Sequence, residues 1–176
     1  MANNATVPRA MIVYESMFGN TRTIAEEIGK ALADLFTVEV VDVVSAPPVI
    51  EDVDLLVVGG PTHAFGMSRP GTRVGARDKG AAGSAERGVR EWLAAVTVVS
   101  APALAAAFDT RVRSPLPGSA RRPILRRLRR LGLRVAKPAS FVVTGTAGPL
   151  AEGELESARR WAATLTEASV ASAVRR

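Results

Sequence analysis

The sequence predicts an α/β fold, a doubly wound parallel sheet of five strands with helices on both faces. Two observations carry this prediction. Short, nearly continuous apolar runs alternate along the chain with amphipathic stretches of helical period, which is the pattern of consecutive βαβ units. The length of 176 residues fits one domain, which we expect to span residues 1–176.

The strands are expected where short apolar runs end at turn residues. They are placed at 10–14, 37–43, 53–58, 103–108 and 140–144. The first is apolar throughout, as a strand buried on both faces requires, and the second is rich in valine. The stretch 45–52 contains two prolines and is expected to be a loop or a short turn.

Helices are expected where apolar residues recur three or four positions apart. They are placed at 21–35, 89–96, 119–131 and 153–170. In the last of these, Leu155 and Leu165 are expected to face inward, and Gly132 is a candidate C-cap of the helix before it. The polar stretch 66–88 carries six glycines and is expected to be a long, mobile loop. Residues 1–8 are expected to be flexible.

Composition excludes several kinds of site. The chain has no cysteine, which rules out disulfides, thiolate metal sites and cysteine nucleophiles. His63 is its single histidine, so a histidine metal cluster is not expected. Residues 1–8 hold no apolar segment, and no apolar run reaches membrane-spanning length. We therefore expect a soluble cytoplasmic protein without a membrane partner.

The net charge of +6 is concentrated in one segment. Residues 111–137 carry ten basic residues and no acidic residue, whereas the rest of the chain carries 13 basic and 17 acidic residues, a balance of −4. The arginine-rich helix could bind nucleic acid, or its arginines could simply form a solvated helix face. No aromatic residues interleave with these arginines, so the solvated face is favoured and nucleic acid is not an expected partner.

The segment Ser16-Met17-Phe18-Gly19-Asn20-Thr21 directly follows the first strand and opens a helix. It supplies two hydroxyls, one amide and a glycine, and the N–H groups at a helix start attract phosphate. A plain turn with Thr21 as N-cap is the alternative. The chain lacks both G-x-x-x-x-G-K-S/T and a G-x-G-x-x-G after the first strand, which argues against a P-loop NTPase and a dinucleotide site.

The string from Tyr14 to Thr21 resembles the phosphate loop of the flavodoxin-like family, Ser/Thr-x-Thr-Gly-Asn-Thr. Phe18 replaces the usual threonine, which removes one hydroxyl and keeps the backbone N–H. The string from Gly59 to Met67 is similar to the G-x-P-T-x-x-G-x-M loop of NAD(P)H:quinone oxidoreductases of the tryptophan-repressor-binding-protein type. The third similarity is Phe108-Asp109-Thr110, which stands where members of the family place a loop under the pyrimidine edge of the flavin. The resemblance implies a flavodoxin-like sheet of order 2-1-3-4-5 and FMN as cofactor.

By that resemblance, three loops would bind FMN. The cofactor-binding residues it implies are Ser16, Met17, Phe18, Gly19, Asn20, Thr21, Pro61, Thr62, His63, Ala64, Phe65, Gly66, Asp109, Thr110 and Arg111. Many flavodoxins sandwich the flavin between two aromatic rings. Here Phe108 is the only aromatic near the third loop and is expected to point into the sheet, so one flavin face would be open or covered by the segment 66–88, a partner or a second subunit.

Two functions follow from the resemblance. The first is electron transfer through bound FMN, with a basic surface that would dock an acidic redox partner protein. The second is an FMN-dependent NAD(P)H:quinone reductase that acts on a small quinone-like acceptor. Against this function, the sequence contains no separate nicotinamide-binding motif. No catalytic residue is assigned. If Arg111 or Arg113 lies near the flavin's pyrimidine edge, its charge raises the reduction potential.

Overall fold

The computed structural model describes residues 7–102, 104–114 and 118–173. Its central sheet has the order β2-β1-β4-β7-β8, with each of these neighbours parallel. The five strands are β1 (Arg9–Tyr14), β2 (Thr37–Asp42), β4 (Leu55–His63), β7 (Leu104–Val112) and β8 (Ala139–Val143). Counted along the chain as five main strands, this is the predicted order 2-1-3-4-5.

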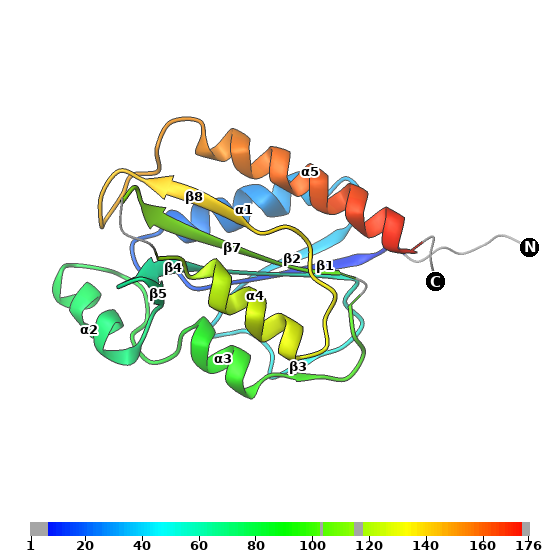
Figure 1. Cartoon of the computed structure of the whole chain (residues 1–176), viewed down its shortest axis with the longest axis horizontal. Coiled ribbons are helices and arrows are strands. Elements are labelled where there is room, and N and C mark those ends of the chain that lie inside the picture. Colours follow the sequence, from blue (N-terminus) through cyan, green and yellow to red (C-terminus); the bar gives the residue numbers. More distant parts are fainter. Residues whose placement is uncertain (1–6, 103, 115–117, 174–176) are drawn as a thin grey trace, which may run out of the picture.

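Helices cover both faces of the sheet (Figure 1). On one face lie α1 (Asn20–Leu32) and α5 (Glu154–Ala173), and on the other lie α3 (Val89–Ala95) and α4 (Arg121–Arg130). Successive strand residues point to opposite faces, so the central strands contribute to both cores. In β4, for example, Val57 packs with the α1 and α5 side, whereas Leu56 packs with the α3 and α4 side.

Several predicted boundaries are shifted. The helix expected at 21–35 ends at Leu32, and Leu35 is 52% exposed. The strands expected to end at residues 58 and 108 continue to His63 and Val112, because the added residues of β4 pair with β7 and β5 and those of β7 pair with β8. Leu155, expected to face inward, is 36% exposed, whereas Leu165 is buried as predicted.

Two short elements in the expected loop 45–52 and after α3 form a separate small sheet. β3 (Val49–Ile50) pairs in parallel with β6 (Thr97–Val98). Ile50 is fully buried in the core beneath α3, so this pair closes the sheet's amino-terminal end on that face. Gly132 has the positive φ of 79° that its predicted place after a helix requires.

The stretch 66–88 is not the continuous loop that its glycine content predicts. It contains β5 (Gly66–Met67), antiparallel to the end of β4, and helix α2 (Pro70–Asp78). Pro70 stands in the helix's first turn, where a missing N–H costs nothing, and Arg73 and Ala76 are its buried residues. The mobility expected of this stretch stays a prediction, and the flexibility expected of residues 1–8 falls largely outside the described residues.

Among the described residues, no helix is both long and apolar enough to cross a membrane.

Candidate functional site

A cavity of about 390 Å³ lies at the carboxyl end of the parallel strands. The loops after β1, β4, β7 and β8 line it, together with α2. Its lining residues are Ser16, Met17, Phe18, Asn20, Thr21, Pro61, Thr62, His63, Ala64, Thr72, Gly75, Ala76, Lys79, Thr110, Arg111, Val112, Val143 and Thr146. Such a place and volume are typical of ligand sites in doubly wound folds.

The structure brings eleven of the fifteen predicted site residues to this cavity. The four that do not line it are Gly19, Phe65, Gly66 and Asp109. Gly19 forms the turn before α1, and Gly66 pairs with His63 in the β4–β5 hairpin. Arg22 also lies away from the cavity, since its side chain is exposed and pairs with Glu26 at 2.7 Å.

The loop 16–21 is shaped by Gly19, which has a φ of +91° and precedes the first residue of α1. A side chain is disfavoured at this φ, so the turn requires glycine. No heavy atom outside its neighbours lies within 4 Å of the point where a Cβ would stand. The Cβ side of the turn is therefore open, and the turn leads into the first N–H groups of α1, which have no carbonyl partner within the helix.

The polar side chains of this loop hold the loop itself. Ser16 Oγ accepts hydrogen bonds from the N–H of Gly19 at 3.1 Å and of Arg22 at 3.2 Å. Asn20 Nδ2 donates to the carbonyl of Ala147 at 3.1 Å. Thr21 is not the N-cap, because it lies inside α1 with its Oγ1 2.7 Å from Thr110 Oγ1. The N–H groups of Asn20 and Thr21 and the Ser16 hydroxyl proton are the donors of this loop that could receive an anion.

Asp109 joins four elements beneath the cavity. Its fully buried carboxylate accepts hydrogen bonds from Thr62 Oγ1 at 3.0 Å, Ser119 Oγ at 2.7 Å, the Arg121 N–H at 3.2 Å and Ser140 Oγ. Arg121 Nη1 also lies 3.9 Å from Oδ1. These partners come from β4, the start of α4 and β8. Asp109 thus holds together the elements around the cavity without lining it, and its predicted contact with the cofactor stays a prediction.

The β4–β5 hairpin carries the second predicted loop. Thr62 pairs with Met67 and His63 with Gly66, which leaves Ala64 and Phe65 as a two-residue turn. Both have positive φ, 41° and 78°, in a turn where glycine or asparagine is preferred. Phe65 is 63% exposed, so its side chain is not folded onto the core. Its carbonyl accepts a hydrogen bond from the Ser119 N–H at 3.2 Å, which fixes the strained turn.

His63 faces the cavity and is partly buried. Its Nδ1 lies 3.2 Å from Thr72 Oγ1 on α2. Burial lowers the pKa of His63, and the charge of Arg73 lowers it further. The imidazole is therefore neutral at pH 7, and it offers the cavity one donor or acceptor without a charge.

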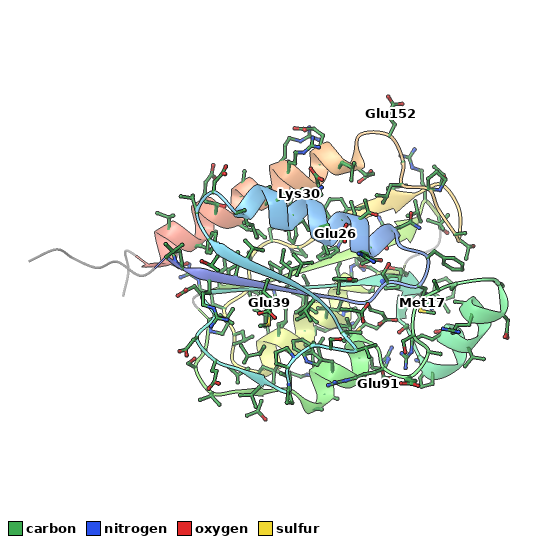
Figure 2. The ribbon with its side chains drawn as sticks, turned by 180° about the vertical axis from the view of Figure 1, so that it is seen from behind. Met17, Glu26, Lys30, Glu39, Glu91 and Glu152 are labelled. Atoms are coloured by element: carbon green, nitrogen blue, oxygen red, sulfur yellow. The ribbon has the colours of Figure 1, made fainter. Side chains whose placement is uncertain are left out.

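Helix α2 and the chain after it form a wall that the sequence analysis missed. Thr72, Gly75, Ala76 and Lys79 line the cavity from this side. Ala76 packs in a small cluster with Met17, and the Gly83 N–H donates to the Met17 carbonyl at 3.0 Å. Figure 2 shows Met17 where the end of β1 meets this segment. The available signal was Pro70, a residue favoured in the first turn of a helix.

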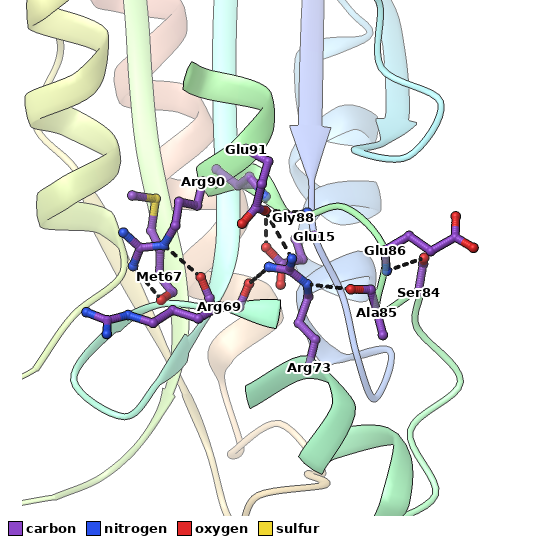
Figure 3. A network of polar contacts seen from close by, with 12 residues as sticks. Glu15, Met67, Arg69, Arg73, Ser84, Ala85, Glu86, Gly88, Arg90 and Glu91 are labelled. Carbon is purple, nitrogen blue, oxygen red and sulfur yellow. Dashed lines mark hydrogen bonds and ion pairs between the residues drawn. The ribbon is translucent and has the colours of Figure 1, made fainter. Parts of the chain in front are cut away.

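A buried ionic network anchors α2 below the cavity (Figure 3). Arg73, which is fully buried, donates from Nε to the Ala85 carbonyl at 3.1 Å and from Nη1 to Ser68 Oγ at 2.8 Å. Its Nη2 lies 3.1 Å from Oε2 of Glu91. These contacts join α2 to β5, to the chain before α3 and to α3 itself.

Glu15 contributes a second carboxylate to this network. It follows the last residue of β1 and directly precedes the segment 16–21. It is 3% exposed, and its Oε2 accepts from the Val89 N–H at 2.9 Å, whereas its Oε1 has no hydrogen-bond partner. Burial raises the pKa of Glu15 against the opposing effects of Ser68, the Val89 N–H and Arg73. Because it points away from the cavity lining, Glu15 positions elements around the site.

The third loop adds charge but no aromatic ring. Thr110, Arg111 and Val112 line the cavity, and Arg111 Nη1 donates to the Gly118 carbonyl at 3.3 Å. Phe108 is fully buried in the sheet, as predicted. Phe18 is the one aromatic residue among the described lining residues. Lys79 and Arg111 are the charged groups of that lining, which includes no carboxylate.

Comparisons with known proteins agree with this architecture. Residues 11–70 match the family model of the flavodoxin domain. A flavodoxin from the domain Archaea is similar over 92% of this chain and 98% of its own, with a TM-score of 0.63 and 21% identity. A flavodoxin, WrbA-like protein from Agrobacterium tumefaciens covers 92% and 97%, with a TM-score of 0.51 and 15% identity. No curated protein sequence matches significantly.

A flavodoxin from Streptococcus pneumoniae is also similar, over 90% of this chain and 97% of its own, with a TM-score of 0.62 and 19% identity. At these identities the structures show the fold. Fold and site together define a doubly wound α/β protein with a cavity at the carboxyl end of its sheet. The chain has the flavodoxin fold, and the match of residues 11–70 to the flavodoxin domain implies FMN as the cofactor.

The residues present fit that cofactor. The cavity lies at the start of α1, whose first N–H groups can receive a phosphate, and its volume is within the size range of small-molecule sites.

Proposed function

We propose that this chain binds FMN in the cavity and transfers electrons through it. The start of α1 carries the proposal: Ser16, Asn20 and Thr21 line the cavity, and the first N–H groups of the helix, at the carboxyl end of β1, have no carbonyl partner within it. An uncharged loop of this kind binds a phosphate monoester through backbone dipoles. A cytoplasmic location and an acidic partner protein stay predictions.

FMN supplies the redox chemistry when bound, and the chain supplies binding and electrostatics. The Ser16 hydroxyl and the first N–H groups of α1 would hold the phosphate. Pro61, Thr62 and Ala64 of the hairpin and Ala76 of α2 would border the flavin. Neutral His63 would offer the flavin an uncharged hydrogen-bonding group, because its Nδ1 is engaged by Thr72 and its ring lines the cavity.

The decisive experiment compares FMN with riboflavin. Quenching of flavin fluorescence should show FMN binding at least tenfold more tightly, since a charged hydrogen bond contributes about 1.5–3 kcal/mol. Gly19→Ala should reduce this preference, because the loop would leave its φ of +91°. Gly132→Ala is the matched control, since Gly132 has a φ of +79° and open space at its Cβ but lies at the end of α4. Equal binding of FMN and riboflavin would refute the phosphate site.

A reductase is the second candidate, and the absence of a second aromatic residue among the described lining residues favours it. A flavin face without an aromatic cover leaves room for a hydride donor or a quinone. The FMN-loaded protein should be mixed anaerobically with NADPH and then with a quinone. Rapid loss of the visible absorbance of oxidised flavin, followed by its return, supports the reductase. Unchanged absorbance favours electron transfer alone.

A further inference from the structure

A groove of about 370 Å³ runs between α3 and α4, beside the β4–β5 hairpin. Four arginines line it, Arg90 from α3 and Arg126, Arg127 and Arg130 from α4. The uncharged lining residues include Met67, whose strand partner Thr62 lines the flavin cavity. The groove and the proposed redox site are therefore separated by one pair of strands.

Two of the four arginines are held in place by backbone carbonyls. Arg90 donates from Nε to the Ser68 carbonyl and from Nη2 to the Met67 carbonyl, both at 2.9 Å. Arg127 donates from Nε to the Leu93 carbonyl at 3.4 Å. These bonds to neutral acceptors fix the guanidinium groups without neutralising them, so their charges and remaining N–H groups are available to an anion.

The other two have no partner among the described residues. Arg126 and Arg130 stand four positions apart on α4, where like charges repel each other, and no ion pair or hydrogen bond engages either side chain within residues 7–102, 104–114 and 118–173. Segment 111–137 contains no acidic residue. Glu91, on the neighbouring helix, is bonded to Gly88 and paired with Arg73 instead.

We propose that this groove docks a carboxylate-rich surface of the protein that exchanges electrons with the flavin, an inference that rests on the proposed function. Planar guanidinium groups bind carboxylates bidentately. Nucleic acid is the weaker fit, because the groove's described lining includes no aromatic side chain on which a base could stack. Docking beside Met67 places such a partner next to the hairpin that borders the flavin.

The first test measures binding of a short fluorescein-labelled oligoglutamate peptide to the FMN-loaded chain by fluorescence anisotropy. Added salt should weaken binding. The double variant Arg126→Gln and Arg130→Gln should weaken it about tenfold, as expected for two partly exposed ion pairs. The control Arg122→Gln and Arg129→Gln removes the same charge from the same helix, outside the groove, and should change binding less than about twofold.

The second test measures electron transfer from the reduced protein to an acidic and to a basic cytochrome. The groove variant and added oligoglutamate should both slow reduction of the acidic cytochrome, whereas the control variant should not. Equal effects of the two double variants would overturn the proposal, as would tighter, groove-dependent binding of oligothymidylate at the same salt concentration. Peptide binding by a chain that fails to bind FMN would refute the proposed function while leaving the groove's carboxylate recognition in place.

Discussion

Replacing Arg73 tests whether the buried network holds α2 against the rest of the domain. Arg73→Met keeps much of the side chain's length and removes its charge and donors. The variant loses the bonds to Ala85 and Ser68 and the 3.1 Å ion pair with Glu91, and it leaves the carboxylate of Glu15 buried beside no cation. Breaking a buried pair in this way costs roughly 3–5 kcal/mol.

Urea unfolding monitored by fluorescence should show this loss as a lower midpoint with an unchanged slope. Arg77→Met is the matched control, because Arg77 is an exposed arginine of the same helix with one bond to the Gly83 carbonyl. It should cost less than about 1 kcal/mol. The deficit of Arg73→Met should shrink in mild acid, where Glu15 takes up a proton. A cost within about 1 kcal/mol of the control would refute the account of the network.

Three further changes test the cavity and one tests pH dependence. Gly75→Leu projects a side chain into open space at the cavity and should lower FMN affinity in a fluorescence titration without lowering the midpoint of unfolding. Gly118→Ala places a Cβ 2.6 Å from the Cα of Phe65, so it should displace the hairpin and cost about 1–3 kcal/mol in thermal unfolding. Arg111→Gln should lower the flavin's midpoint potential in a redox titration by about 40 mV per electron, the equivalent of about 1 kcal/mol for a charge 4 Å away in water. Glu15→Gln should flatten the pH profile of stability: the raised pKa of Glu15 makes the folded wild type bind the proton more tightly, so its stability falls as pH rises from 4.5 through that raised value.

Each of these changes has a control or an outcome that contradicts it. Gly71→Leu adds the same side chain to the same helix, also into open space, but outside the cavity lining, and should leave FMN affinity unchanged. Arg113→Gln removes an arginine that does not line the cavity and should move the potential less than Arg111→Gln. An unshifted hairpin and full stability in Gly118→Ala would contradict the close packing. A pH profile of Glu15→Gln parallel to that of the wild type would show that another group dominates.

The sequence predicted the elements whose pattern is local. The apolar run at 10–14 and the helical spacing of Ile24, Ile28 and Leu32 identify their elements because burial on one or both faces sets the period directly. The first loop was located because Gly19 and the residues around it stand between such elements. Boundaries were less well predicted, since the extension of β4 and β7 depends on pairing partners distant in the sequence.

Three features of the site depend on contacts that no local pattern reveals. Helix α2 is stabilised by a buried Arg73, a residue type that sequence patterns assign to the surface. Asp109 was assigned to the cofactor because Phe108-Asp109-Thr110 resembles a flavin loop of the flavodoxin-like family, and in the structure its carboxylate receives donors from residues up to 47 positions away. The hydroxyl of Thr21 is likewise directed to Thr110, which follows it by 89 positions.

Arg90 lines the arginine groove and also holds the hairpin that borders the flavin cavity, since its guanidinium donates to the carbonyls of Met67 and Ser68. A ligand that draws Arg90 toward itself would break these two bonds and leave β5 held by its pairing with β4. Binding energies linked in this way are reciprocal. Occupancy of the groove would then change flavin affinity by the same factor by which bound flavin changes the groove's affinity for its ligand, with Arg90 as the side chain that couples the two sites.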